Sequence, residues 1–565
     1  MSWIVTSLAR LYPWAVDPGE ELRLAIDFLD GSLSAETIVR AGYGAGLVVT
    51  GFVGLAILLV PAQFRIATLL GAVAVGLCTV HAVHAGPKLL ATARRTSALG
   101  TAPDLVARAV LSMRLAPTPE RAAAFTAKAD DGILAASLER HVRQSEGTAE
   151  SGLVSFGETW GELFPSLRRA CGLVAAAGQT PARDRDRLLD RALRVVLDGT
   201  REQMQSFASR IRAPATALYA FGVLLPTALV ALVPAAGAAG LPITPLGIGV
   251  VYGILLPAVL LVASIWLLAH RPVAFPPPNV STEHPAVEDR HRVAILAGTG
   301  GTVAGWLAGE ALLPPWGAVI SSIGVGTGLT LWVYYWPVVR IYERVRRAEE
   351  TLPDALALVG RRVANGRAVE TAIEHAGAEL DGEMGTLLAT GARQQRQLQV
   401  GVRQAFLGRH GALRTLPSPR IRGSFALLGL AADEGRPAGA ALLTLAEHVE
   451  DLGRIEQESR HSLEHVCRTL RSTGSVFAPA IAGSTVALAD GIDGGGFLPG
   501  GEQSLPWLGA IVGWYVLVLA VLLTALATGL TRGLDRSLVG YRVGRTLVAA
   551  TVTYAGAYLL VGTVV

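Results

Sequence analysis

The stretch that decides the fold is residues 340–380, RIYERVRRAEETLPDALALVGRRVANGRAVETAIEHAGAEL. Its centre is typical of a helix start. Thr351 can cap the helix through its hydroxyl, Pro353 is tolerated in a first turn, and Asp354 favours the positive end of the helix dipole. The apolar residues that follow recur at helical spacing and predict a face that packs on other helices: Leu352, Leu356, Val359 and Val363.

The same helix start occurs a second time, early in the chain. Residues 101–104 (TAPD) match residues 351–354 (TLPD), and Glu120 then aligns with Glu370. Apolar segments flank both copies at similar distances. The sequence therefore predicts a tandem duplication with an equivalent helical bundle in each half. The motif residues, to which we assign a structural role, are Thr101, Pro103, Asp104, Thr351, Pro353 and Asp354.

The composition indicates a membrane protein without its own nucleotide site. The chain has 565 residues, is 51% hydrophobic and has a net charge of +4, with a mean hydropathy of +0.44; this is typical of many membrane spans. Its only lysines, Lys88 and Lys128, do not follow a glycine, so a P-loop is absent. The three cysteines are scattered and form no C-x-x-C pair. We expect no enzymatic activity, cofactor, catalytic residue or metal.

Nine apolar segments have the length needed to cross about 30 Å of hydrocarbon. The predicted fold is all-α: a polytopic membrane protein of about nine transmembrane helices, built as a tandem parallel repeat with two cytoplasmic helical-bundle domains. The predicted order is a cytoplasmic segment at 1–40, spans 1 and 2 in 41–84, helical domain 1 at 85–213, spans 3 and 4 in 214–270, a Pro-rich cytoplasmic linker at 271–292, spans 5 and 6 in 293–338, helical domain 2 at 339–472, spans 7 and 8 in 473–531, a cytoplasmic loop at 532–545, and span 9 in 546–565.

Arginines in the short loops predict the orientation. Three arginines flank the linker 271–292 and four lie in the loop 532–545, whereas residues 235–245 carry no charge. By the positive-inside rule, the N-terminus and both charged blocks are cytoplasmic and the C-terminus is outside. Residues 18–30 predict a short amphipathic helix that lies on the membrane surface or on another helix.

Two short patterns have both a functional and a simpler interpretation. His81 and His84 share a helix face and could bind a metal, but no third ligand is evident, so we interpret them as interfacial side chains. The sequence Asn279-Val-Ser281 matches a glycosylation site, but the predicted topology places it in the cytoplasm.

The glycines of spans 5 and 6 follow the G-x-x-x-G spacing, which allows close approach of membrane helices. We interpret Gly301, Gly305 and Gly309, and likewise Gly324 and Gly328, as packing residues. No span centre carries Asp, Glu, Lys or Arg, which argues against an ion-coupled carrier.

The second charged block contains a basic run. Residues 391–423 include seven arginines and no Asp or Glu. A solvated face, or contact with anionic lipid, is sufficient to explain the run. The sharper hypothesis is that it docks an acidic protein partner; we expect no nucleic acid to bind. The candidate residues are Arg393, Arg396, Arg403, Arg409, Arg414, Arg420 and Arg422.

Three motifs together resemble the helical domain of the type II secretion system F family, the platform proteins of type IV filament machines. They are residues 352–356 (LPDAL), the step from Gly366 to Glu370 and Ala372, and the segment from Glu434-Gly435 to Ala446. Two such domains in one chain resemble the archaeal branch, which serves the archaellum and archaeal type IV pilus assembly. The first block departs from the pattern, with Gly178-Gln179 in place of Glu-Gly.

The resemblance implies a multi-pass platform protein in the cytoplasmic membrane. It would bind a hexameric secretion ATPase and couple its motion to pilin or archaellin assembly and protein secretion. We also expect a homodimer. Two other classes stay open: a permease subunit driven by a separate ATPase, and a membrane receptor or scaffold without a motor. The large size of the two charged blocks favours the platform over the permease.

Overall fold

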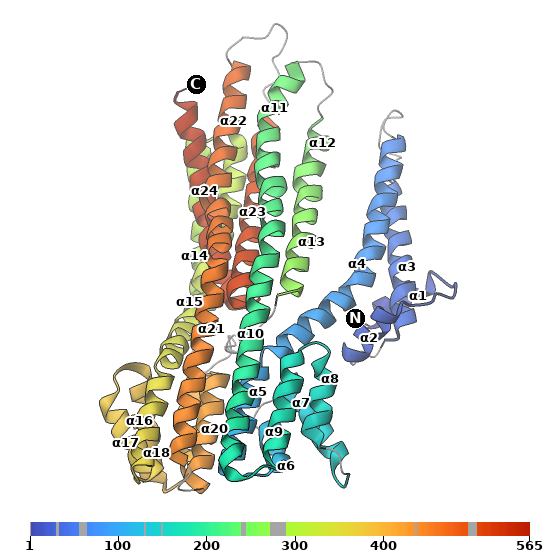
Figure 1. The fold of residues 1–565 in the computed structure, drawn as a ribbon. Coiled ribbons are helices and arrows are strands. Elements are labelled where there is room, and N and C mark those ends of the chain that lie inside the picture. Colours follow the sequence, from blue (N-terminus) through green and yellow to red (C-terminus); the bar gives the residue numbers. More distant parts are fainter. Residues whose placement is uncertain are drawn as a thin grey trace. The chain divides into compact units, whose positions relative to one another are not determined.

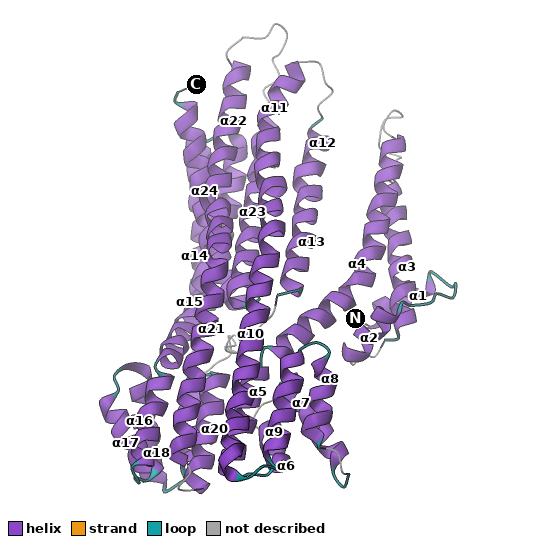
Figure 2. Cartoon of the chain, in the orientation of Figure 1, coloured by secondary structure: helices purple, strands orange, loops and turns teal. Residues whose placement is uncertain are grey.

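The computed structural model describes residues 2–29, 33–55, 65–128, 132–148, 151–238, 244–271, 290–434, 438–494 and 506–564. The described residues are 89% helix and contain no strand (Figure 2). The all-α prediction is therefore confirmed for this part of the chain. Most of the Pro-rich linker, the pattern at 279–281 and Gly435 lie outside the described residues.

The chain divides into two compact units, Met1–Ser97 with Trp266–Arg271, and Ala98–Ile265 with Pro272–Val565. The first unit contains α1 (Ser2–Arg10), α2 (Glu20–Leu29), α3 (Ala35–Gly54) and most of α4 (Arg65–Leu99). α2 is the amphipathic helix predicted from residues 18–30, and it packs on another helix, because Leu22 and Ile26 are buried against Val39 of α3.

The second unit contains two blocks of helices at one end (Figure 1). The first block comprises α5 (Ala102–Leu115), α6 (Pro119–Lys128), α7 (Ile133–Ser145), α8 (Gly152–Gly161), α9 (Pro165–Ala177) and α10 (Ala182–Tyr219). The second block comprises α16 (Leu352–Ala364), α17 (Val369–Glu379), α18 (Gly382–Leu398), α19 (Val402–Leu407), η5 (Ala412–Thr415), α20 (Pro419–Glu434) and α21 (Ala438–Ser472). The predicted apolar stripe of α16 is confirmed, since Leu352, Leu356 and Val359 are buried.

The more apolar helices of this unit extend from the two blocks (Figure 1). They are α11 (Leu225–Ala238), α12 (Pro245–Val250), α13 (Leu256–Ala269), α14 (His291–Leu312), α15 (Pro315–Glu350), α22 (Ala478–Gly494), α23 (Pro506–Arg532) and α24 (Arg536–Gly562). Three short π-helical turns continue into these helices: η3 (Ala220–Leu224), η4 (Val251–Leu255) and η6 (Thr473–Phe477).

Seven helical stretches of the described chain are long and apolar enough to cross a membrane: Ala35–Gly54, Thr68–Leu115, Ala182–Val233, Pro245–Ala269, Pro315–Ala364, Gly439–Gly491 and Trp507–Arg532. They overlap predicted spans 1 to 4 and 6 to 8. Predicted spans 5 and 9 form the helices α14 and α24. Both mix Gly and Thr with their apolar residues, and neither is among the seven.

The predicted boundaries between spans and blocks do not coincide with helix ends. α4 and α15 run without a break from apolar into charged sequence, although each contains a proline, Pro87 or Pro337. The proline ring removes one hydrogen bond, which tertiary packing can compensate. The same continuity joins α10 to α11 through η3, and α21 to α22 through η6.

Glycines bring the backbones of α14, α15 and α24 together, as their spacing predicts. A Cβ on Gly305 would lie 2.5 Å from the carbonyl oxygen of Ser321, and one on Gly309 would lie 2.6 Å from that of Gly317. On the other side of α15, Gly328 lies against Gly544 of α24 in the same way. The packing interpretation of these glycines is therefore confirmed.

The predicted hydroxyl cap at Thr351 is wrong. Its Oγ1 donates to the carbonyl oxygens of Arg347 and Ala348 in the preceding turn, at 3.2 and 3.3 Å. Thr101 does the same, donating to Ala98 at 2.9 Å. The reason is backbone geometry, because both threonines have helical dihedral angles (φ −91°, ψ −1° and φ −97°, ψ 0°) instead of the extended ones of a capping residue.

Candidate functional site

The two blocks meet on α5, the helix that begins with the motif of residues 101–104. Nearly every described side chain of α5 is buried, whereas its counterpart α16 buries a single face. The second block buries the rest of the α5 surface, because its helices α20 and α21 pack on α5. The motif carboxylates differ accordingly: Asp104 is half-buried at this joint and Asp354 is exposed.

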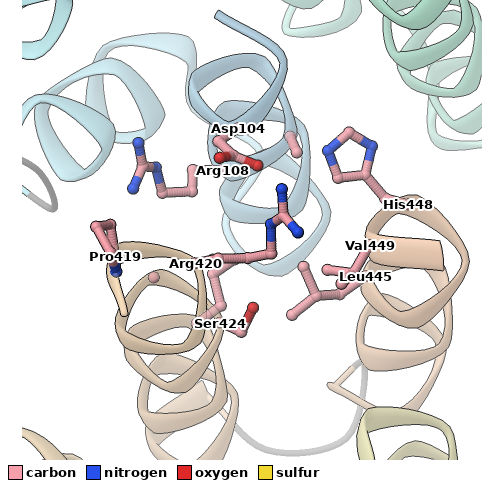
Figure 3. A pocket seen from close by; sticks show the side chains of 11 residues that line it. Asp104, Arg108, Pro419, Arg420, Ser424, Leu445, His448 and Val449 are labelled. Atoms are coloured by element: carbon pink, nitrogen blue, oxygen red, sulfur yellow. The ribbon is translucent and has the colours of Figure 1, made fainter. Parts of the chain in front are cut away.

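A small pocket lies at the joint, with a volume of about 30 Å³. Its polar lining comes from α5 (Asp104 and Arg108), α20 (Arg420 and Ser424) and α21 (His448). Figure 3 shows Asp104 and Arg420 pointing toward one another, with the His448 imidazole facing the same space. A volume of this size holds about two water molecules, so the pocket is a polar joint and not a substrate cavity.

Arg420 is the electrostatic centre of this joint. It forms an ion pair with Glu456 at 3.4 Å, and both side chains are largely buried. Burial alone would lower the pKa of Arg420, but the carboxylates of Glu456, Asp104 and Glu349 outweigh it and raise this pKa. Glu349 lies in the charged end of α15, beyond its apolar part, and accepts a hydrogen bond from Ser418. Burial raises the pKa of Glu349 despite Arg420 and Ser418. Arg420 therefore acts on three carboxylates, one of which, Glu456, also pairs with Arg460.

His448 is the least satisfied group at the joint. It is 4% exposed, and neither ring nitrogen has a hydrogen-bond partner among the described residues. It lies in the charged part of α21, before the apolar sequence that begins at residue 473. Burial lowers the pKa of His448 to about 4, although Asp104 and Asp451 act in the opposite direction. The imidazole is therefore neutral at pH 7.

Replacing His448 by leucine should leave the protein at least as stable at pH 7, because the change removes two unsatisfied polar atoms. The advantage should grow as the pH falls. Between pH 6.5 and 4, His448 of the unfolded wild type binds a proton that the folded wild type does not bind. The free energy of unfolding of the wild type therefore falls with pH, whereas leucine at this position contributes no such loss. The difference should increase by about 2 kcal/mol from pH 6.5 to 5.

Thermal unfolding in detergent at the two pH values measures this difference. His465→Leu, on the exposed face of the same helix, is the control. A stability difference between His448→Leu and the wild type that does not change with pH would contradict the assignment of a buried neutral imidazole.

Polar contacts extend the joint along α10 and α21. Arg201 donates two hydrogen bonds to the Glu458 carboxylate, at 3.0 and 3.3 Å. Arg114 donates to Thr444 at 2.8 Å and pairs with Asp190, thereby contacting both long helices. Between these contacts, Leu197, Leu452 and Ile455 form an apolar cluster. The two blocks are therefore held together by charged and apolar contacts along their long helices.

The structure separates the seven arginines predicted as a partner site. Arg420 is buried at the joint, and Arg396 pairs with Glu374. The other five are exposed and form no ion pair with a described residue: Arg393 on α18, Arg403 on α19, Arg409 in the following loop, Arg414 on η5 and Arg422 on α20. These elements follow one another in the chain, and α19 packs on α18, η5 and α20.

The remaining motif positions are structural. Pro103 and Pro353 lie in the first turns of α5 and α16, as predicted. Glu434 is the last residue of α20. In the first unit, His84 contacts the carbonyl oxygen of Val39 at 3.1 Å and the ring of Tyr43. No group of three possible metal ligands occurs among the described residues.

Sequence reasoning missed His448, Glu349 and Glu456 as parts of one site. They stand far from Asp104 in the chain, and each resembles an ordinary residue of a charged helix. One signal was available: His448 follows Leu445 and precedes Val449, both buried, so its place on the apolar face of α21 could have been predicted from helical spacing.

Comparison with known proteins adds no relative. No protein-family model, no curated protein and no solved structure matches the chain.

Proposed function

We propose that the chain is the membrane platform of a type IV filament machine, a non-enzymatic protein that couples a cytoplasmic hexameric ATPase to the assembly of pilin or archaellin subunits. The proposal rests on the resemblance of residues 352–372 and 434–446 to the type II secretion system F family. The proposed machine assembles a pilus, an archaellum or a related secretion filament.

The observation that best supports this role is the pair of long helices α10 and α21. Each continues through a π-helical turn into an apolar helix, and each continuous stretch is long and apolar enough to cross a membrane. At 1.5 Å per residue, the charged part of each extends roughly 50 Å from the apolar part. Because the two helices are joined by Arg201, Glu458 and the apolar cluster, a force applied to the blocks reaches both membrane segments.

Several structural features support the duplication that the repeated sequence predicts. Pro87 and Pro337 lie inside long helices at the same number of residues before Thr101 and Thr351. η3 and η6 follow α10 and α21 at equivalent points of the two halves. Both threonines have the same hydrogen bonding to the preceding turn. We propose two parallel repeats of four spans and one final span, with α14 and α24 as spans 5 and 9.

The five exposed arginines, Arg393, Arg403, Arg409, Arg414 and Arg422, define the proposed docking surface for the ATPase. Arginines on a charged face steer association and fix the register of a complex more than they increase affinity. The proposed orientation places this surface in the cytoplasm, because the arginine-rich segment 532–545, from the end of α23 into α24, lies at the end of these helices that is nearer the blocks.

Charge reversal of the docking surface tests the proposal. Arg393→Glu, Arg403→Glu and Arg409→Glu together should abolish co-purification of the chain with its filament ATPase and stop filament assembly. Membrane insertion should be unchanged, because all three side chains are exposed. Binding by the wild type should weaken as salt rises, since exposed charges are screened over about 8 Å at physiological ionic strength.

A matched control carries the same charge change elsewhere. Arg183, Arg191 and Arg194 are exposed on α10 and form no ion pair with a described residue; their reversal to Glu should leave binding intact. Undiminished ATPase binding by the Arg393/Arg403/Arg409 variant would refute this docking surface. Co-purification with a transporter-type ATPase instead would favour the permease.

A further inference from the structure

Three arginines lie together where the apolar helices meet the charged end of the second unit. Arg471 is in the last turn of α21, Arg532 is the last residue of α23, and Arg542 lies in the second turn of α24. The three helix ends are adjacent: α21 packs on α23, and α23 packs on α24. Nη1 of Arg542 reaches Oγ1 of Thr528, one turn before the end of α23, at 3.5 Å.

The positive charge of this arginine cluster (Arg471, Arg532 and Arg542) is compensated only in part within the described chain, where Glu343 of α15 acts on Arg532. None of the three arginines forms an ion pair with a described residue. Asp535, the carboxylate between α23 and α24, accepts hydrogen bonds from the backbone N–H groups of Ser537 and Leu538 and from the Tyr342 hydroxyl. Its lone pairs are therefore largely used by the start of α24.

The three side chains also act on one another electrostatically. Burial and, in the same direction, the neighbouring charges of Arg532 and Arg471 together lower the pKa of Arg542 to about 10. Half-buried cations near one another are unfavourable unless an anion joins them. The cluster therefore has the charge and the donors to hold an anion, since guanidinium groups match phosphate oxygens in bidentate geometry.

The residues around the cluster indicate that this anion belongs to a lipid headgroup. α15 carries a band of aromatic residues that includes Trp332, Tyr335 and Trp336. α24 contacts this band beside Arg542, because Gly540 lies against Tyr335 and Gly544 against Trp332. Arginines stack on the same band: Arg545 on Trp332, and Arg290 and Arg340 on Trp336. Tryptophan, tyrosine and arginine at one depth are typical of the lipid headgroup region.

We propose that Arg471, Arg532 and Arg542 bind the phosphate of an anionic phospholipid at the charged ends of α21, α23 and α24. The lipid anion supplies the counter-charge that the chain lacks, and it joins the two helices of the α23–α24 hairpin to the end of α21. The site is separate from the docking surface and does not depend on the filament role.

The test uses the full chain in nanodiscs of phosphatidylcholine alone or mixed with phosphatidylglycerol. Thermal unfolding and native mass spectrometry measure stability and bound lipid. Phosphatidylglycerol should raise the unfolding midpoint of the wild type. Arg532→Gln with Arg542→Gln should weaken phosphatidylglycerol binding roughly tenfold or more. In pure phosphatidylcholine the same variant should be at least as stable as the wild type, because it has lost mutual repulsion.

The control is Arg183→Gln with Arg191→Gln, which changes the charge equally at exposed positions of α10. Arg471→Gln alone provides a second variant if the double variant is not recovered. Equal phosphatidylglycerol binding by wild type and cluster variants would overturn the proposal. So would an equal rise in the unfolding midpoint with inorganic phosphate in phosphatidylcholine, since the anion would then not need to be a lipid.

Discussion

Arg420→Met should lower the free energy of unfolding by about 3–5 kcal/mol, the usual cost of leaving buried charges without their partner. The substitution keeps most of the side-chain volume but removes the only cation that acts on Glu349 at the joint. Glu456 would keep its pairing with Arg460, whereas Asp104 and Glu349 would face one another's negative charge. The joint between the two helical blocks should loosen first.

Denaturant titration in mild detergent measures this loss, and Arg422→Met provides the control. Arg422 stands two residues further along α20 but is exposed and has no ion pair with a described residue. Its replacement should change stability by about 0.5 kcal/mol at most. Adding Glu349→Gln to Arg420→Met should restore part of the stability, because it removes one of the orphaned charges. Equal stability of the Arg420→Met and Arg422→Met variants would show that the joint is not electrostatic.

Gly305→Leu should separate α14 from α15 and destabilise the protein by about 1–3 kcal/mol, as expected for overpacking in a close contact. A Cβ at this position meets three atoms of the α15 backbone: the carbonyl oxygen and carbon of Ser321 at 2.5 and 2.8 Å, and the Cα of Ser322 at 3.1 Å. Backbone atoms cannot rotate away like the end of a side chain, so the helices themselves must move apart.

Gly300→Leu on the same helix is the matched control. A Cβ on Gly300 meets no atom within 4 Å, and leucine suits an apolar environment and a helix better than glycine does. The Gly300 variant should therefore be as stable as the wild type or more so. Measurement of the unfolding midpoint and of the yield in the membrane distinguishes the two. Similar results for both variants would contradict the close packing of α14 on α15.

Much of the helical architecture could be predicted from local signals. The repeated prolines and acidic residues at the starts of α5 and α16, and the G-x-x-x-G spacing in α14, act through neighbouring residues. The exact ends of the spans could not be predicted in this way. Packing over the whole second unit allows α15 to continue through Pro337, and no local signal records that packing.

The joint between the blocks could be predicted only in part. Asp104 appears in a motif, but its environment differs from that of Asp354 because α20 and α21 of the other block also pack on α5, whereas α16 buries a single face. This asymmetry depends on contacts between residues that are far apart in the chain. For the same reason, Arg420 has the sequence signature of an exposed basic run and yet is a buried counter-ion.

Photo-crosslinking in living cells tests the proposed contact with an ATPase most directly. A photoreactive phenylalanine at position 403, on the exposed side of α19, should crosslink to the filament ATPase while filaments are being assembled. The same residue at position 191, on α10, should not. Mass spectrometry identifies the attached protein. A crosslink at position 403 to the filament ATPase alone is the result that the platform role predicts; a crosslink to a transporter ATPase, or to lipid alone, would contradict it.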